Sequence, residues 1–438
     1  MKEQSLRRQA AVTAGGNAAV RMLGFGMRLA VTRLLGAEAV GVMELAASAH
    51  MAALTAAAAG LPGAVSRVCA RATEQNRHAV LQAGRGLALR SGLLISGLLL
   101  ALSPLLSRLL GDARTLPSLL LLAPSVAVVA LSSVYDGYFF GVGNAWPPML
   151  SELAEQLARL AITLTLLLRL PTLSVAGRAA VPALALAVGE ACGLAVVIHF
   201  GKGSAARVDP ARLPPIRKRL TRLALPLTAS RLSHTGLRAL CSVLIPLRLA
   251  AGGMEHGAAM RALGMLSGMV TPLLLLPGML AGALGTVGGP AAAKCRGARV
   301  ENRLALRLAG CSLAVGLLCA AGLYALAPTI AVRLYRTPEA AALLRRMCPL
   351  AVLMPLQQAL SGVMTGLGLQ KKTLLASLLG AAATLLCTYL WTPNGGITGA
   401  GMASLAGHAL SLLCSVFSFL CRDTRPCGKM PVDGLREA

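Results

Sequence analysis

Twelve long apolar segments divide this chain, and they restrict it to one kind of architecture. Each is about 20 residues long, which is the length that an α-helix needs to cross a bilayer. Only 13% of the 438 residues are charged and 56% are apolar, whereas about a quarter of the residues of a soluble domain are charged. These properties exclude a disordered chain, a coiled coil and an ordinary soluble enzyme. The segments are 14–34, 43–66, 86–107, 116–140, 148–168, 180–200, 222–247, 260–290, 305–328, 347–367, 373–391 and 397–420. The sequence therefore predicts an all-α polytopic membrane protein with about 12 transmembrane helices.

The basic residues are distributed unevenly between the two sides of the predicted membrane. The net charge is +26, from 42 Lys and Arg against 16 Asp and Glu. If the N-terminus is in the cytoplasm, 26 of the 42 basic residues fall in cytoplasmic loops and tails, and 11 fall on the opposite side. Because basic loops stay inside, this split predicts an even number of spans with both termini cytoplasmic. Loops that face anionic lipid account for the charge, and we expect no nucleic-acid partner.

The two halves of the chain share a spaced pattern of glycine and arginine. Three glycines that close segment 4 recur at the end of segment 10 with a constant offset of 225 residues, as Gly137, Gly141 and Gly143 and as Gly362, Gly366 and Gly368. Segments 1 and 7 each contain two arginines seven residues apart, which is two helical turns. The pattern favours a duplication over chance similarity between helices rich in Leu, Ala and Gly.

The duplication predicts a two-lobed domain organisation. It consists of an N-terminal six-helix lobe (1–201), a cytoplasmic linker (202–221), a C-terminal six-helix lobe (222–421) and a cytoplasmic tail (422–438). Lobes with the same orientation in the membrane are related by a pseudo-two-fold axis along its normal, as in a MATE/MOP-like fold, and a substrate site is expected between them.

Five cationic or titratable residues lie within the predicted spans. An arginine at mid-bilayer costs at least about 2.5 kcal/mol on insertion scales, and such residues usually face a wet cavity or a partner. The five are Arg21 and Arg28 in segment 1 and Arg231, His234 and Arg238 in segment 7. The last three share one helix face. Because arginine binds phosphate by bidentate hydrogen bonds, we expect these residues to form a cationic cavity for an anionic headgroup, above all a diphosphate. The alternative is that the side chains extend from helix ends to the membrane surface.

Carboxylates within the spans predict coupling groups or ion pairs inside a lobe. Glu155 and Arg159 are four residues apart on one helix, so a local ion pair is the expected arrangement. Glu190 has no partner close in sequence, and either an arginine on another helix or a bound proton would compensate its charge. Glu44, early in segment 2, belongs to the same class.

No enzyme signature is present in the sequence. The chain contains no P-loop lysine and no H-E-x-x-H motif, and its eleven cysteines show neither C-x-x-C spacing nor a His/Cys cluster. We expect no catalytic residues, no cofactor, no metal site and no disulfide framework.

Motifs along nearly the whole chain resemble the stage V sporulation protein B family of the MOP flippase superfamily, which is related to the MurJ-type flippases. They are Arg21–Arg28 and Thr32–Gly41 in segment 1, Gly60–Pro62 with Ser66–Arg67 in segment 2, Gly137–Phe139 to Gln156 and Arg159 in segments 4 and 5, Ser230–Leu232 in segment 7, Gly264–Met269 with Pro272, Pro277 and Pro290 in segment 8, and Gly366–Gly368 to Gly396–Ala400 in segments 10 to 12. The resemblance implies two lobes that alternate between inward-open and outward-open states. It also implies export of lipid-linked sugars, such as lipid II or another polysaccharide precursor, across the cytoplasmic membrane of a bacterium. Arg21, Arg28 and Arg231 match arginines that bind the diphosphate in MurJ-type flippases, whereas Arg238 is added on spacing alone. Relatives often carry two further spans that extend a lipid-tail groove.

The leading hypothesis is a flippase for an undecaprenyl-diphosphate-linked glycan, with a role in cell-wall or spore formation. Its partners would be the lipid-linked oligosaccharide, the bilayer and cell-wall synthesis enzymes. A cation-coupled multidrug exporter of the same fold is an alternative, but it favours carboxylates in the cavity. A non-transporting membrane scaffold for cell-wall or spore assembly is a second alternative, in which the intramembrane arginines have no purpose.

Overall fold

The computed structural model describes residues 22–201, 210–278 and 298–422, and every regular element in these ranges is helical. A helix over residues 22–35 comes first and residues 271–278 continue the element η4 as a helix. The long elements are α2 (Ala37–Ala58), α3 (Leu61–Arg71), α4 (Glu74–Leu109), α5 (Leu116–Val142), α6 (Trp146–Arg169), α7 (Val175–Gly201), α8 (Leu213–Ala251), α9 (His256–Gly264), α11 (Ala298–Thr329), α12 (Ala340–Met347), α13 (Leu350–Gly366) and α14 (Gln370–Leu420). The 3₁₀ turns η1 (Ala113–Thr115) and η3 (Pro210–Arg212) and the π-helical segments η4 (Met265–Val270) and η5 (Ile330–Leu334) complete them.

The predicted segments correspond to helices or to pairs of helices. Segment 2 is α2 with α3, segment 8 is α9 with η4 and residues 271–278, segment 10 is α12 with α13, and segments 11 and 12 together are α14. In the described ranges, seven helices are long and apolar enough to cross a membrane, or eight if the pair α12 and α13, bent by 43°, is one span. The long helices α6 and α8 fall outside this set because polar residues interrupt them, such as Glu152 and Glu155 in α6 and Arg231 and Arg238 in α8. The all-α membrane fold is therefore as predicted.

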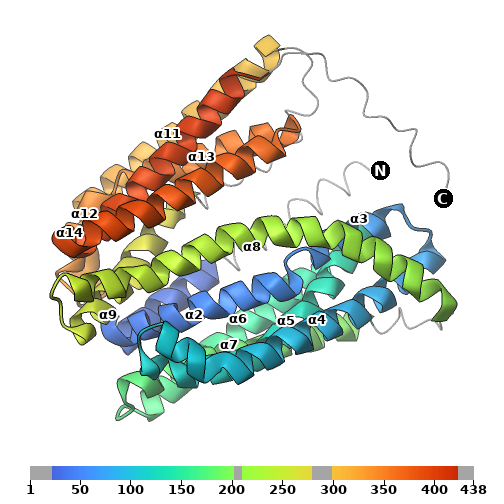
Figure 1. Ribbon diagram of the computed structural model, residues 1–438, viewed down its shortest axis with the longest axis horizontal. Helices are drawn as coiled ribbons and strands as arrows, with labels where there is room; N and C mark the ends of the chain where they lie inside the picture. Colours follow the sequence, from blue (N-terminus) through green and yellow to red (C-terminus); the bar gives the residue numbers. More distant parts are fainter. Residues whose placement is uncertain (1–21, 202–209, 279–297, 423–438) are drawn as a thin grey trace.

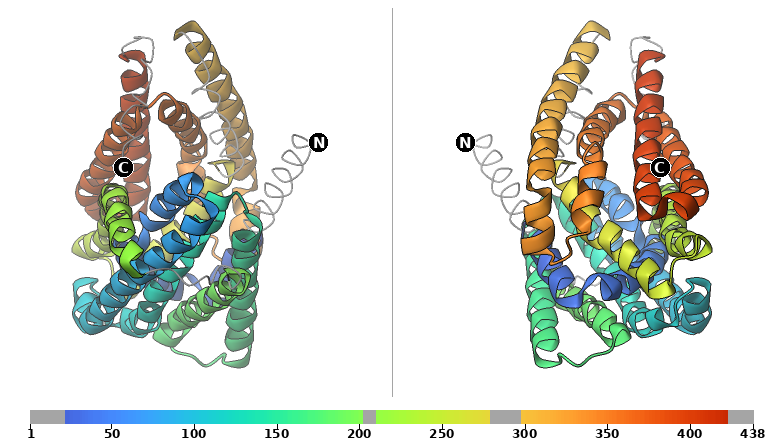
Figure 2. Two further views of the ribbon diagram at one scale, coloured as in Figure 1. Left: turned by 90° about the vertical axis from the view of Figure 1, so that its right-hand side faces the viewer. Right: turned by 90° about the vertical axis from the view of Figure 1, so that its left-hand side faces the viewer.

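The helices form two groups that meet at one end and diverge towards the other (Figure 1). Residues 22–201 form the N-terminal group, and residues 213–278 and 298–422 form the C-terminal group. Within the C-terminal group, α11 to α14 diverge from the N-terminal helices, whereas α8 runs along them and packs against α2, α3 and α4 as well as against α14 (Figure 1). The side views in Figure 2 show α11 and α14 extending together beyond the N-terminal group. We call the end that carries η1 and the start of α9 the latch end, and the end where α3 meets α4 the open end. The first eight residues of the predicted linker lie outside the described ranges, whereas residues 213–221 form the first turns of α8.

Glycines hold the two groups in backbone contact at the latch end. A Cβ atom placed on Gly264 of α9 would lie 1.8 Å from the carbonyl oxygen of Ala37 in α2. A Cβ atom on Gly41, one turn further along α2, would lie 2.0 Å from the carbonyl oxygen of Met260. Neither position has room for a side chain, so the sequence of α2 and α9 allows the two groups to close tightly here.

Backbone conformation supports the predicted repeat. Gly143 after α5 and Gly368 after α13, 225 residues apart, both adopt the left-handed conformation, with φ of 86° and 79°. The same offset relates Gly111 (φ 80°), before η1, to Arg336 (φ 54°), before α12. Arg336 is the one non-glycine residue with positive φ in the described ranges. The two halves therefore share this left-handed turn, which is formed by a glycine in the first half and by Arg336 in the second.

The element α14 is a helical hairpin rather than a single rod. Gly396 has φ 59° and ψ −149°, and it separates the two halves. The halves pack against each other through small residues, because a Cβ atom on Gly407 would lie 1.8 Å from Thr384 Oγ1 and one on Gly380 would lie 2.6 Å from the carbonyl oxygen of Gly407. Segments 11 and 12 are therefore separate antiparallel helices, as the sequence predicts.

Candidate functional site

A cavity of about 480 Å³ lies between the two helix groups, and we call it the central cavity. It is lined by α2 (Met51, Leu54, Thr55, Ala58), Ala59, Pro62 of α3, α5 (Val129, Ser133), α8 (Ser230, Arg231, His234, Thr235) and α14 (Leu374, Ser377). Arg231 is exposed, and no described residue forms an ion pair with it. The central cavity therefore combines apolar walls from both groups with one unneutralised guanidinium.

A second cavity of about 190 Å³ lies within the C-terminal group, and we call it the C-terminal chamber. Its charged and titratable lining residues are His234, Arg238, Cys241 and His408. His234 and Ser377 line both cavities, so the chamber adjoins the central cavity along α8 and α14. The face of α8 that carries Arg231, His234 and Arg238 therefore borders both cavities rather than one.

Arg28 connects three elements instead of lining either cavity. Its Nη2 donates to Glu44 Oε1 of α2 at 2.5 Å and to the backbone carbonyl of Ser267 in η4 at 3.0 Å. The side chain is 43% exposed, so the pair remains within reach of water. The sequence predicts Glu44 as an ion-pair residue and Arg28 as a substrate-binding residue. In the structure, Glu44 is the ion-pair partner of Arg28.

A compact ion cluster lies inside the N-terminal group. Arg159 of α6 forms an ion pair with Glu155 one turn earlier, and its Nη2 also lies 2.6 Å from Glu190 Oε1 of α7. Both arrangements that the sequence suggests are present, namely the local pair and the pair across helices. One guanidinium thus serves two carboxylates in the space between α6 and α7.

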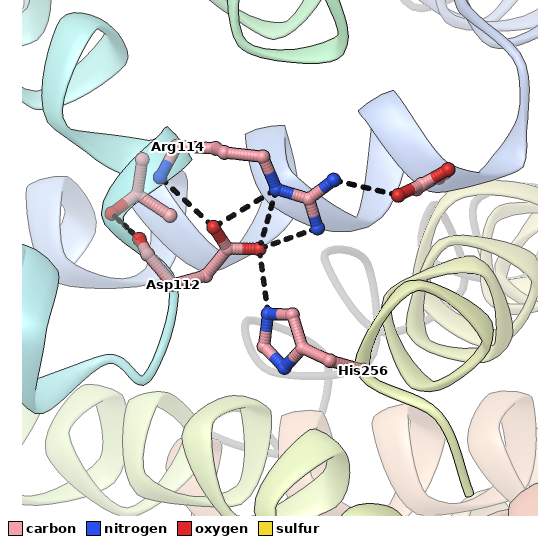
Figure 3. A network of polar contacts seen from close by, with 5 residues as sticks. Asp112, Arg114 and His256 are labelled. Carbon is pink, nitrogen blue, oxygen red and sulfur yellow. Dashed lines mark hydrogen bonds and ion pairs between the residues drawn. The ribbon is translucent and has the colours of Figure 1, made fainter.

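A polar network joins the two groups at the latch end (Figure 3). Asp112, which precedes η1, accepts hydrogen bonds from Arg114 Nε at 3.0 Å and Nη2 at 2.8 Å, and its Oδ2 lies 3.0 Å from His256 Nε2 at the start of α9. Arg114 Nη1 continues the network to Glu38 Oε1 of α2 at 2.6 Å. Burial acts to raise the pKa of Asp112, but hydrogen bonds from Arg114 and His256 outweigh this and hold the pKa below its ordinary value. The contact between His256 and Asp112 is the part that crosses between the groups.

The structure brings together some of the predicted site residues and separates others. Arg231, His234 and Arg238 line the adjoining cavities, Arg28 is paired with Glu44, and Arg21 lies outside the described ranges.

Sequence reasoning missed two features. The first is the network of Asp112, Arg114 and His256, for which the sequence offers no signal because His256 lies 144 residues from Asp112. The second is His408, an intramembrane histidine of segment 12 that the same argument about costly polar groups would have selected.

Comparison with known proteins identifies the family. A family described as "Polysaccharide biosynthesis protein" matches residues 6–295, about two thirds of the chain. Stage V sporulation protein B of Bacillus subtilis (strain 168) is 27% identical over 434 residues, which cover 94% of this chain and 83% of that protein.

Solved structures show the same fold at low sequence identity. The lipid II flippase MurJ in an inward closed conformation matches with a TM-score of 0.75 and 12% identity, over 93% of this chain and 87% of that one. An inward-facing MATE-family multidrug resistance transporter of the MOP superfamily matches with a TM-score of 0.69 and 17% identity, over 90% and 92% of the two chains. The fold is therefore MATE/MurJ-like, in a multi-pass membrane protein with bacterial homologues. With its family match extending across more than half of its length, the chain belongs to the polysaccharide biosynthesis protein family.

Proposed function

We propose that this protein moves an undecaprenyl-diphosphate-linked glycan, such as lipid II or a related polysaccharide precursor, across the cytoplasmic membrane of a bacterium by alternating access. The observation that carries the proposal is the central cavity, in which Arg231 and His234 face the space between the two helix groups and no described lining residue is a carboxylate. A guanidinium in such a cavity binds a phosphate by charge-assisted hydrogen bonds.

The proposed cycle follows from the placement of the latch and the cavity. With both termini in the cytoplasm, the open end faces the cytoplasm and the latch end faces outward. The headgroup enters from the open end and meets Arg231, while the lipid tail stays in the bilayer between the diverging helix groups. Opening of the latch and closing of the open end then expose the headgroup outside. Arg28 contributes when the diphosphate replaces Glu44 as its anionic partner, and cell-wall synthesis enzymes consume the product.

Three carboxylates of the N-terminal group are already paired with arginines, which weighs against drug export. A cation-coupled multidrug exporter needs carboxylates available to a cationic substrate or to the coupling ion. Glu155 and Glu190 are engaged by Arg159, and Glu44 is engaged by Arg28. No described lining residue of either cavity is acidic.

The proposal is tested by a headgroup-accessibility assay in proteoliposomes that contain lipid II. The wild-type protein should move the headgroup across the membrane, and Arg231→Ala should slow this about tenfold or more, because one charged hydrogen-bonding partner is lost. The matched control is Arg108→Ala at the exposed end of α4, which should transport like the wild type. Drug efflux without lipid movement, or full lipid movement by Arg231→Ala, would contradict the proposal.

A further inference from the structure

The C-terminal chamber carries a positive charge that nothing in its walls neutralises. Arg238 is the only permanently charged residue among those that line it, and no described residue forms an ion pair with Arg238. The described part of the C-terminal group contains three carboxylates, and none of them lines the chamber. Glu301 binds Arg422, while Glu255 and Glu339 lie in the turns that precede α9 and α12. An intramembrane cation usually faces a water-filled cavity or a partner, and the chamber offers the exposed Arg238 no carboxylate as that partner.

The walls of the chamber also supply hydrogen-bond donors. His408 Nδ1 lies 2.8 Å from the backbone carbonyl of Ser404, and because a carbonyl only accepts, Nδ1 carries the hydrogen. This leaves Nε2 as the ring nitrogen that a ligand in the chamber can use. Gln357 Nε2 donates to Ser411 Oγ at 2.5 Å, so the hydroxyl hydrogen of Ser411 remains free to donate.

Other hydroxyl groups of the chamber are already committed to the backbone. Ser242, Ser377 and Thr384 each donate to a carbonyl three or four residues earlier in their own helix. The donors that remain are therefore the Arg238 guanidinium, the hydroxyl groups of Ser267 and Ser411, one amide hydrogen of Gln357 and a ring N–H of His234, with His408 as a donor when Nε2 is protonated.

Size and position narrow the class of ligand. A chamber of about 190 Å³ is smaller than the roughly 300–1,000 Å³ of sites for drug-sized molecules, so it suits a small ion or a single group of a larger molecule. A guanidinium with several donors around it matches a tetrahedral oxyanion. His234, shared with the central cavity, marks the side from which such a group would arrive.

We propose that the C-terminal chamber is a binding site for a phosphate group, with Arg238 as its charge partner and His408 and Ser411 as further ligands. The inference rests on the proposed function only for the carrier of that phosphate, which is either the lipid-linked headgroup or free inorganic phosphate. The binding site itself follows from the chamber.

Titration of inorganic phosphate into the full-length protein in nanodiscs of zwitterionic lipid tests the site. Saturable binding is expected, and Arg238→Gln should weaken it about tenfold or more through loss of the charged hydrogen bonds. His408→Phe, which removes both ring nitrogens, and Ser411→Ala should weaken binding several-fold. The matched control is Arg222→Gln, an exposed arginine on the same helix, which should change the affinity less than about twofold because Arg222 lines neither cavity.

The outcomes separate this site from the proposed function. Absence of saturable phosphate binding to the wild type, or an Arg222→Gln effect as large as that of Arg238→Gln, would overturn the chamber site while leaving flipping untouched. If phosphate binds through Arg238 but proteoliposomes move no lipid-linked glycan, the chamber stands and the proposed function fails. Displacement of the phosphate by lipid II identifies the headgroup as the carrier, whereas simultaneous binding identifies free phosphate. Three variants and a wild-type measurement keep the test decisive even if one variant does not fold.

Discussion

At the scale of single residues, the contact between the two helix groups depends on glycines as well as on charged side chains. Gly41 and Gly264 allow the backbones of α2 and α9 to be in contact, and a side chain at either position would clash with a carbonyl oxygen of the other helix. Arg28, in contrast, donates from Nη2 to two acceptors on different elements, namely Glu44 and the carbonyl of Ser267. Each feature leads to a prediction at this scale.

Gly264→Val should prevent the latch end from closing. The new Cβ atom would lie 1.8 Å from the Ala37 carbonyl oxygen, so α9 must move away from α2. We expect increased labelling of cysteines introduced at the latch end from outside the membrane, together with reduced transport. Gly310→Ala on α11, where a Cβ atom meets nothing within 4 Å, is the control. Unchanged labelling in Gly264→Val would show that the close contact is not what seals this end.

Arg28→Lys should impair transport although the charge is kept. A lysine ammonium is a point charge and does not reproduce the planar fork that grips a phosphate while reaching a second acceptor. Transport by Arg28→Lys should fall several-fold in the proteoliposome assay, while Arg33→Lys, exposed on the same helix, should transport normally. Full activity of Arg28→Lys would argue against phosphate binding by this residue.

At the scale of elements, α6 and α7 are joined by charge rather than by apolar packing alone. Arg159 is shared by Glu155 from its own helix and Glu190 from the next, and all three side chains are largely buried. Removal of the shared cation leaves two carboxylates facing each other without compensation, which is more costly than the loss of the ion pairs themselves.

Arg159→Met should therefore destabilise the N-terminal group strongly. Breaking a buried pair from one side costs about 3–5 kcal/mol, and thermal unfolding in detergent should reveal a correspondingly lower transition temperature. Glu190→Gln in the Arg159→Met background should recover part of the loss, because it removes one of the stranded charges. An Arg159→Met protein as stable as the wild type would contradict the structural role of this cluster.

At the scale of the whole molecule, the latch network is where a turn of one helix group meets a helix of the other. Asp112 is 3% exposed and receives bonds from Arg114 and His256. Since the latch holds the closed end together, its chemistry decides under which conditions that end opens.

The latch should survive mild acid. A carboxyl group whose pKa is lowered in the folded state contributes its full stability above its unfolded value of about 3.9 and loses it only as pH falls through the lower folded value. Lowering the outer pH from about 7 to 5 should therefore not weaken the bonds to Asp112. Asp112→Asn should weaken the latch by about 1–3 kcal/mol at every pH in this range, because bonds to a charged acceptor become bonds to a neutral one.

Spin-label distances across the latch end would check both statements. They should stay constant between pH 7 and 5 in the wild type and lengthen in Asp112→Asn. Opening of the wild-type latch over this pH range would contradict the assignment of Asp112 as its acceptor.

The sequence predicts features that depend on chain order and periodicity. The helical segments follow from apolar length, the pair of Glu155 and Arg159 follows from helical spacing, and the turns at Gly143 and Gly368 follow from a repeated offset. Features that depend on how helices rotate against one another do not follow. Periodicity puts Arg231 and Arg238 on one face of α8, yet Arg238 borders a cavity that α13 and α14 also line, whereas Arg231 borders a cavity that α2 and α5 also line. Asp112 and His256 are 144 residues apart, and only the closed arrangement of the two groups brings them together.

His234 lines both the central cavity and the C-terminal chamber, so an anion bound in one cavity affects the hydrogen bonds available in the other. A single imidazole ring offers two nitrogens, and a hydrogen donated to an anion on one side is withheld from the other. In its neutral form the ring has one N–H, so it can donate to an anion in only one of the two cavities at a time, whereas the protonated ring can donate to both. Occupancy of one cavity therefore changes what the neutral His234 offers to the other.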